Sequence, residues 1–281
     1  MALADYKLKF FADLIQKEIG IIYSTAVYFQ LEQRLEKCVT KFNLGTTDKL
    51  YDLAFSEGIN GELKAFFLDI STNNETSFFR DTKLFNAIEK NLIPNLSKNF
   101  PGTFSFRIWC AASSFGQEPY SMAILIHEFL KLNPKHPKIE VMTSDISDQA
   151  LERCKKAIYS NLEINRGLTP ERIRKYFTEI KNDQWKLNDE ICNIVSVRKQ
   201  NLLDSFQALG QFHVILCRYV LIYQDVEKKK SIIQKLVNSL YPNGTLILGA
   251  SESAFGLTTE LSQSSITDGA IVYKKDQSLA A

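Results

Sequence analysis

The sequence is poor in the residues that build metal sites and disulfide frameworks. Only five of its 281 residues are cysteine and three are histidine, and no two cysteines form a Cys-x-x-Cys pair. Zinc sites and disulfide scaffolds are recognised by closely spaced cysteine and histidine residues. We therefore predict no metal site, and we expect free thiols in a reducing compartment.

Long apolar runs are also absent. No stretch reaches the roughly 18 consecutive apolar residues of a membrane-spanning helix. Charged residues such as Asp5, Lys7 and Asp13 interrupt the first 20 residues, which therefore lack the apolar core of a signal peptide. The sequence predicts a soluble, cytoplasmic protein without direct membrane insertion.

An excess of charge of one sign is missing as well. Lys and Arg number 34, Asp and Glu number 32, and the formal net charge is +2. A nucleic-acid-binding protein would need a basic stripe with interleaved aromatic residues, which the sequence lacks. We expect no nucleic-acid partner, and the absence of an apolar heptad repeat predicts a monomer.

The hydrophobic residues, 45% of the chain, follow two successive patterns. Apolar residues recur at helical spacing through residues 1–72, which predicts a small all-helical N-terminal domain. From 104 to 281, short β-rich runs alternate with helical stretches, which predicts βαβ units and a mostly parallel sheet. Residues 73–103 form a linker between the two. The last two runs, "GTLILGASE" and "AIVYKK", are close enough in sequence to form an antiparallel edge hairpin instead of another crossover.

Residues 157–201 are an excursion from this alternation. Thr169 before Pro170 marks a helix start, and short strands with polar turns follow it. One interpretation is a decorative surface loop. The other, which we adopt, is a small β-subdomain at about 177–200 that contacts a partner.

The segment 108–126, "IWCAASSFGQEPYSMAILI", predicts a buried strand, a turn of small residues ending at Gly116, and a helix with Pro119 in its first turn. Strand-turn-helix units of this kind line the ligand crevice of open parallel sheets. The turn lacks the GxGxxG pattern of dinucleotide sites and carries Glu118, which would repel a pyrophosphate and attract a cation. S-adenosylmethionine, with its sulfonium and amino acid tail, is therefore favoured over NAD as the ligand.

Two further polar positions follow the next strands. Asp145 comes directly after one apolar run, where a carboxylate can accept hydrogen bonds from both ribose hydroxyls. The segment "NLLD" at 201–204 follows another run, where an amide and a backbone group can read an adenine edge. The alternative is that Glu118 and Asp145 serve only as a helix N-terminal charge and a helix N-cap.

The segment "TNNETSFFRD" (72–81), together with "WCAASSFGQEPYS", "SDIS", "NLLD" and "FHVILCRYVLIYQD", closely resembles the CheR family of chemotaxis receptor methyltransferases. The resemblance covers nearly the whole chain. It implies a Rossmann-like class I methyltransferase fold that uses S-adenosylmethionine and releases S-adenosylhomocysteine. The implied activity is methylation of glutamate side chains in bacterial chemoreceptors, and the implied partner is the cytoplasmic methylation region of these receptors.

The resemblance also assigns site residues. It implies that Arg80 and Tyr223 position the acceptor beside the methyl group, and these two are our candidate catalytic residues. Each position has a structural alternative: Thr76 as a helix cap, Arg80 in a surface salt bridge with Asp81, and Tyr223 as a core aromatic residue. The implied cofactor contacts are Asn74, Thr76, Arg80, Glu118, Asp145, Asn201, Leu202, Cys217 and Arg218.

Two positions depart from the family pattern. Phe115 stands in the turn where the family usually has Ser or Thr, and Tyr219 replaces the Asn that usually follows Cys-Arg. Bulky side chains there support a rival hypothesis, a non-catalytic signalling module of the same fold that binds cofactor or product and a receptor. A methyltransferase acting on nucleic acid or a small molecule is a third hypothesis.

The family resemblance implies a basic docking helix for the acidic methylation region. In this sequence the helix is "FQLEQRLEKCVTKF", which offers Arg34, Lys37 and Lys41 against Glu32 and Glu36. An ordinary amphipathic surface helix is the alternative, because the segment is less basic than the family version. The excursion from 178 to 200 is somewhat short for gripping a receptor tether peptide, and we do not assume a tether.

Overall fold

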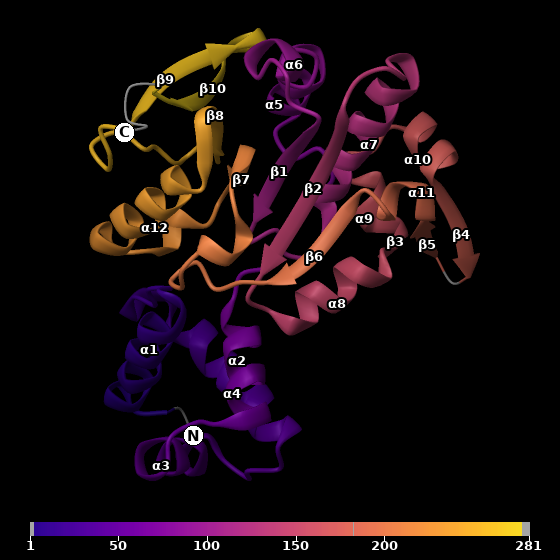
Figure 1. Cartoon of the computed structure of the whole chain (residues 1–281). Helices are drawn as coiled ribbons and strands as arrows, with labels where there is room; N and C mark the ends of the chain where they lie inside the picture. Colours follow the sequence, from indigo (N-terminus) through magenta and orange to yellow (C-terminus); the bar gives the residue numbers. More distant parts are fainter. Residues whose placement is uncertain (1–2, 182, 277–281) are drawn as a thin grey trace.

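The computed structural model describes residues 3–181 and 183–276. Four helices and a short 3-10 turn form a separate N-terminal bundle below the sheet in Figure 1. Each helix buries an apolar face in a shared core that contains, among others, Phe11, Ile15, Leu31, Leu35 and Phe67. The predicted N-terminal helices are therefore present. They are α1 (Asp5–Ile19), η1 (Thr25–Val27), α2 (Tyr28–Lys41), α3 (Thr47–Ser56) and α4 (Gly61–Ser71).

The remainder of the chain is built on a seven-stranded sheet with the order β6-β2-β1-β7-β8-β10-β9. The first five strands in this order pair in parallel, and β8, β10 and β9 pair antiparallel. The chain leaves β1 toward one edge and returns through β7 toward the other, so ligand-binding loops meet beyond β1 and β7. The strands are β1 (Ser105–Ala111), β2 (Lys138–Asp145), β6 (Val195–Lys199), β7 (Phe212–Cys217), β8 (Leu240–Leu248), β9 (Leu261–Ile266) and β10 (Ala270–Lys275).

The mostly parallel sheet confirms the sequence prediction. The expected antiparallel pairing of the last two runs is present between β8 and β10. An additional strand, β9, lies outside them at the sheet edge. Its polar sequence "LSQSSI" has no apolar alternation that would mark it as a strand.

Helices cover both faces of the sheet. Ile108 and Cys110 of β1 pack with α7 (Gln117–Leu132), whereas Trp109 and Ala111 pack on the opposite face with α12 (Val226–Asn238). This division follows from the two-residue period of a strand. The remaining helical elements around the main sheet are α5 (Thr82–Ala87), the π-helical turn η2 (Ile88–Leu92), α6 (Leu96–Asn99), α8 (Asp148–Lys156), η3 (Gln207–Leu209), η4 (Leu221–Tyr223) and η5 (Thr267–Gly269).

The predicted linker packs firmly on the sheet. Phe78 and Phe85 are buried in the same cluster as β1 and α7. The segment therefore holds its polar residues in a defined place over the strand ends.

The excursion forms a separate three-stranded antiparallel sheet with the order β3-β5-β4. Thr169 caps α10 as predicted, with Pro170 as its first residue. The small sheet spans 158–187, earlier than the predicted range of about 177–200, because Val195 and Val197 of β6 pair with β2 in the main sheet. Its elements are β3 (Ile158–Ser160), α9 (Asn161–Asn165), α10 (Pro170–Tyr176), β4 (Phe177–Lys181), β5 (Gln184–Leu187) and α11 (Asp189–Cys192).

In the described ranges 3–181 and 183–276, no helix is both long and apolar enough to cross a bilayer.

The loop after α9 presses directly on the linker. Gly167 has a φ of +108°, and an added Cβ would lie 1.9 Å from the carbonyl oxygen of Phe78.

We predict that Gly167→Ala lowers the free energy of unfolding by about 3 kcal/mol, because a backbone carbonyl cannot move aside and the left-handed conformation is strained. Gly102→Ala is the matched control. It has a φ of +79° and open space around the added Cβ, so it should cost only about 1 kcal/mol. If denaturant titrations gave the same loss of unfolding free energy for both variants, the close contact between Gly167 and the Phe78 carbonyl would be contradicted.

Candidate active site

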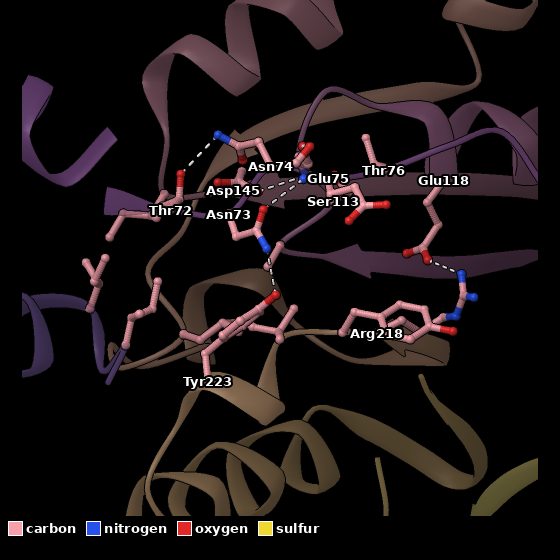
Figure 2. Close-up of a pocket in the computed structure, with 18 of the residues that line it drawn as sticks. Thr72, Asn73, Asn74, Glu75, Thr76, Ser113, Glu118, Asp145, Arg218 and Tyr223 are labelled. Atoms are coloured by element: carbon pink, nitrogen blue, oxygen red, sulfur yellow. Dashed lines mark hydrogen bonds and ion pairs between the residues drawn. The ribbon is translucent and has the colours of Figure 1, made fainter. Parts of the chain in front are cut away.

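A pocket lies at the carboxyl ends of β1, β2 and β7, at the point where the strand order reverses (Figure 2). It holds about 940 Å³ of space not filled by atoms, part of it open to solvent. The pocket is lined by the linker segment 72–77, the turn after β1, the ends of β2, β6 and β7, and Ile19 and Ile21 from the N-terminal domain.

The structure brings the sequence-predicted site residues together, with one exception. Cys217 does not line the pocket, because it is the last residue of β7 and its side chain is buried in the core on the α12 face. Tyr219, two residues later, lines the pocket in its place. The lining residues from the predicted set are Asn74, Thr76, Arg80, Glu118, Asp145, Asn201, Leu202, Arg218 and Tyr223.

The turn after β1 brings backbone close to the pocket. Ala112, Ser114 and Gly116 all adopt positive φ, and a Cβ on Gly116 would lie 2.6 Å from the sulfur of Cys154. Phe115 does not line the pocket. Its ring lies 3.9 Å from the guanidinium carbon of Arg153 on α8. The bulky residue that departs from the family pattern is therefore directed away from the ligand.

Asp145 ends β2 and is 5% exposed. Its Oδ2 accepts the backbone N–H of Ser114 at 2.8 Å, and its Oδ1 accepts that of Ser147 at 2.9 Å. Burial raises the pKa of this carboxyl above its usual value, while these backbone donors oppose the shift. Ser147, not Asp145, is the N-cap of α8. Each oxygen of Asp145 retains a lone pair for a ligand hydroxyl.

Asn201 connects the pocket to the N-terminal domain. Its Nδ2 donates to the carbonyl of Glu18 at 2.8 Å, and its Oδ1 accepts the backbone N–H of Leu203 at 3.0 Å. The Leu202 carbonyl accepts a hydrogen bond from Lys235 at 2.6 Å. The amide nitrogen and the amide oxygen of Asn201, which we expected to read an adenine edge, thus each already form a hydrogen bond within the protein.

Arg218 is the centre of a buried ion network. Its side chain is 1% exposed and lies 2.6 Å from Glu118 Oε2 and 2.5 Å from Asp81 Oδ2. Figure 2 shows the Glu118 and Arg218 side chains pointing toward one another. Burial raises the pKa of Glu118, and Arg218 opposes that shift. Burial alone would lower the pKa of Arg218, but the two carboxylates raise it, so the guanidinium stays charged.

Asp81 pairs with Arg218, so the surface salt bridge between Arg80 and Asp81 considered from the sequence is not formed. Arg80 instead stacks over the ring of Tyr219, 3.8 Å from its centroid, and donates to the carbonyl of Glu75 at 3.1 Å. The Tyr219 hydroxyl donates to Asp81. The second departure from the family pattern therefore lies against a candidate catalytic residue.

Tyr223 lies in η4 and is half-buried, so it is not a core aromatic residue. Its hydroxyl accepts a hydrogen bond from Asn73 Nδ2 at 2.7 Å (Figure 2). Its carbonyl accepts the backbone N–H of Ile22 at 2.9 Å. Asn73 and Gln224 also line the pocket but were missed from the sequence. The only indication in the sequence that they belong to the site is that they lie next to Asn74 and Tyr223 in the chain.

The polar groups fit S-adenosylmethionine. Asp145 offers acceptors for a ribose diol. Glu118 Oε2 is paired with Arg218, which leaves the other carboxylate oxygen to face an ammonium group. The buried Nε of Arg218 has no hydrogen-bond partner within residues 3–181 and 183–276, which suits a ligand carboxylate.

Comparisons with known proteins agree with this site. Residues 74–270 match the family model described as CheR methyltransferase, SAM binding domain. The chain is 37% identical over 276 residues to the chemotaxis protein methyltransferase of Vibrio parahaemolyticus, covering 98% of each chain. It is also 32% identical over 263 residues to the Escherichia coli chemotaxis protein methyltransferase, covering 90% of this chain and 86% of the relative. The chain therefore belongs to the CheR family of chemotaxis methyltransferases that depend on S-adenosylmethionine.

Proposed function

We propose that the protein methylates glutamate side chains in the cytoplasmic methylation region of chemoreceptors, acting as a monomer in the cytoplasm and producing glutamate methyl esters. The observation that carries the proposal is the convergence of Arg80 and Tyr223 with Glu118, Asp145 and Arg218 in one pocket. S-adenosylmethionine, when bound, supplies an electrophilic methyl group on a positively charged sulfur. The chain's own residues bind this cofactor and orient the acceptor.

A glutamate acceptor needs no general base. Its ordinary pKa is about 4.3, so at neutral pH it is already the carboxylate nucleophile. Arg80 stacks on Tyr219 and uses Nη1 toward Glu75, which leaves donors of its planar guanidinium for an acceptor carboxylate. The Tyr223 hydroxyl accepts from Asn73, so its own proton is free to donate. These two groups can orient the acceptor without removing a proton from it.

A dry site would favour the reaction. Attack of a carboxylate on a sulfonium methyl neutralises two opposite charges, and water stabilises the separated charges more than the transition state. Ile19 and Ile21 supply apolar walls from the N-terminal domain. Positioning and exclusion of water are the main contributions we assign to the protein.

The first test concerns the cofactor. Asp145→Asn removes the charge and one acceptor position, and should weaken S-adenosylhomocysteine binding by roughly 10- to 100-fold in calorimetric titrations, as expected for hydrogen bonds to a charged group. Asp148→Asn is the matched control, because Asp148 is exposed on α8 and bonded to Lys199. Unchanged affinity in Asp145→Asn would remove Asp145 from the cofactor site.

The second test concerns the acceptor. Arg80→Ala should lower the rate of receptor methylation by about 100-fold because the acceptor loses its orientation. Tyr223→Phe should lower it by about 10-fold, the effect of one hydrogen bond. Methanol released from the product by mild base measures glutamate methyl esters. Arg174→Ala and Tyr6→Phe change exposed residues outside the pocket and are the controls.

Unchanged rates in both Arg80→Ala and Tyr223→Phe would contradict their assigned roles. An intact protein that binds S-adenosylhomocysteine but forms no ester would instead support the non-catalytic module suggested by Phe115 and Tyr219.

The docking face on α2 differs from the sequence prediction. Arg34 turns inward and donates to the carbonyls of Ile70 at 2.7 Å and Thr72 at 2.9 Å, so it holds the start of the linker. Lys37 and Lys41 remain exposed. We propose that these two lysines contribute the basic face that meets the acidic receptor region.

Reversing both charges should therefore weaken receptor recognition alone. Lys37→Glu with Lys41→Glu should raise the KM for a receptor fragment by roughly 10-fold at low salt and leave S-adenosylhomocysteine affinity unchanged. Lys83→Glu with Lys90→Glu, on the linker helices, is the control for net charge. An unchanged KM would exclude this face.

A further inference from the structure

Glu252 lies in the loop that follows β8 and accepts four backbone hydrogen bonds. Its Oε2 accepts the N–H of Tyr219 at 2.7 Å and that of Gly249 at 2.8 Å. Its Oε1 accepts the N–H of Val220 at 2.8 Å and that of Ile222 at 3.2 Å. One carboxylate therefore satisfies donors from the ends of both β7 and β8.

Three of these four donors belong to the segment 219–222. This segment connects Arg218, at the end of β7, to Tyr223, and apart from the single turn of η4 it has no regular secondary structure. Its backbone N–H groups need partners that a sheet ladder does not provide. Tyr219 also has a φ of +59°, an unfavourable conformation for a bulky residue. The carboxylate of Glu252 compensates for both.

The neighbouring backbone is shaped to admit this carboxylate. A Cβ on Gly249 would lie 2.8 Å from Glu252 Oε2 and 2.9 Å from the backbone nitrogen of Tyr219. Any larger residue at 249 would therefore press on the contact between Glu252 and the segment 219–222. Glycine is needed there for the close approach, not for its φ.

We infer that Glu252 is a positioning residue for methyl transfer. It acts through the backbone of 219–222 on Tyr219, against which Arg80 stacks, and on Tyr223. The inference rests on the proposed function, because it assigns Glu252 to the same acceptor site. Asp145 and the linker residues Asn74 and Thr76 come from other elements, and among the described residues none of them is hydrogen-bonded to Glu252. Glu252 therefore orients the acceptor more than it binds the cofactor.

The test compares two conservative variants. In Glu252→Gln an NH₂ group replaces one oxygen and faces two backbone N–H donors, so two of the four bonds are lost. We expect kcat for receptor methylation to fall by about 100-fold, the order that a 1 Å displacement causes. The Kd for S-adenosylhomocysteine should change by less than about 3-fold, since Asp145 and the linker contacts lie on other elements and Arg218 keeps its ion pairs with Glu118 and Asp81. Glu252→Asp retains both acceptor oxygens on a side chain one methylene shorter, so its kcat should lie between those of Glu252→Gln and the unmodified protein.

The control is Glu227→Gln, which changes an exposed carboxylate in the first turn of α12 and should leave kcat unchanged. An unchanged kcat in Glu252→Gln would overturn the inference. So would a loss of cofactor affinity equal to the loss of kcat, because that indicates general damage to the pocket. A Glu252→Asp variant no better than Glu252→Gln would also contradict it.

Hydrogen exchange separates failure of the inference from failure of the proposed function. The amides of Tyr219, Val220 and Ile222 should exchange faster in Glu252→Gln than in the unmodified protein, whether or not receptor is methylated. If the unmodified protein forms no ester but these amides lose protection in the variant, the proposed function fails and the loop-holding role stands. If protection is unchanged, the positioning role fails.

Discussion

The buried ion network of Arg218 is the constraint on which the site depends. It joins the end of β7, the first turn of α7 through Glu118, and the linker through Asp81. Arg218 is 100 positions from Glu118 and 137 positions from Asp81 in the chain. A buried guanidinium is costly unless paired, so removal of either carboxylate leaves an uncompensated charge. The network therefore keeps the linker motif over the strand ends.

The pocket is a composite of three parts of the chain. The methyltransferase domain supplies Glu118 at the start of α7 and Asp145 at the end of β2, the linker supplies Asn74, Thr76 and Arg80, and the N-terminal domain supplies two isoleucines. Burial of Phe78 and Phe85 against β1 and α7 anchors the linker, and Arg34 holds the carbonyl of Thr72 directly before it. Hydrophobic packing thus sets the position of the linker, and hydrogen bonds set its orientation.

Patterns with a fixed period could be predicted from the sequence. Helical spacing identified the N-terminal bundle, alternation of strands and helices identified the parallel sheet, and ordered motifs identified the pocket-lining residues. Tertiary pairing could not be predicted. Nothing in "LSQSSI" distinguishes an edge strand, and nothing near Arg34 shows that it turns inward to the linker. Cys217 was wrongly assigned to the pocket, because as the last residue of β7 it directs its side chain into the core on the α12 face, whereas the next residue, Arg218, lines the pocket.

The contacts of α1 with the pocket have a mechanical consequence. Asn201 holds the Glu18 carbonyl, and Tyr223 accepts the N–H of Ile22, so the end of α1 is attached to two residues that line the pocket. Because α2 shares a core with α1, a receptor that displaced α2 would also displace α1 and strain these two hydrogen bonds. Thermodynamic reciprocity then requires that cofactor occupancy alter receptor affinity by the same factor as receptor alters cofactor affinity. The N-terminal domain would then couple the binding of the receptor to the binding of the cofactor.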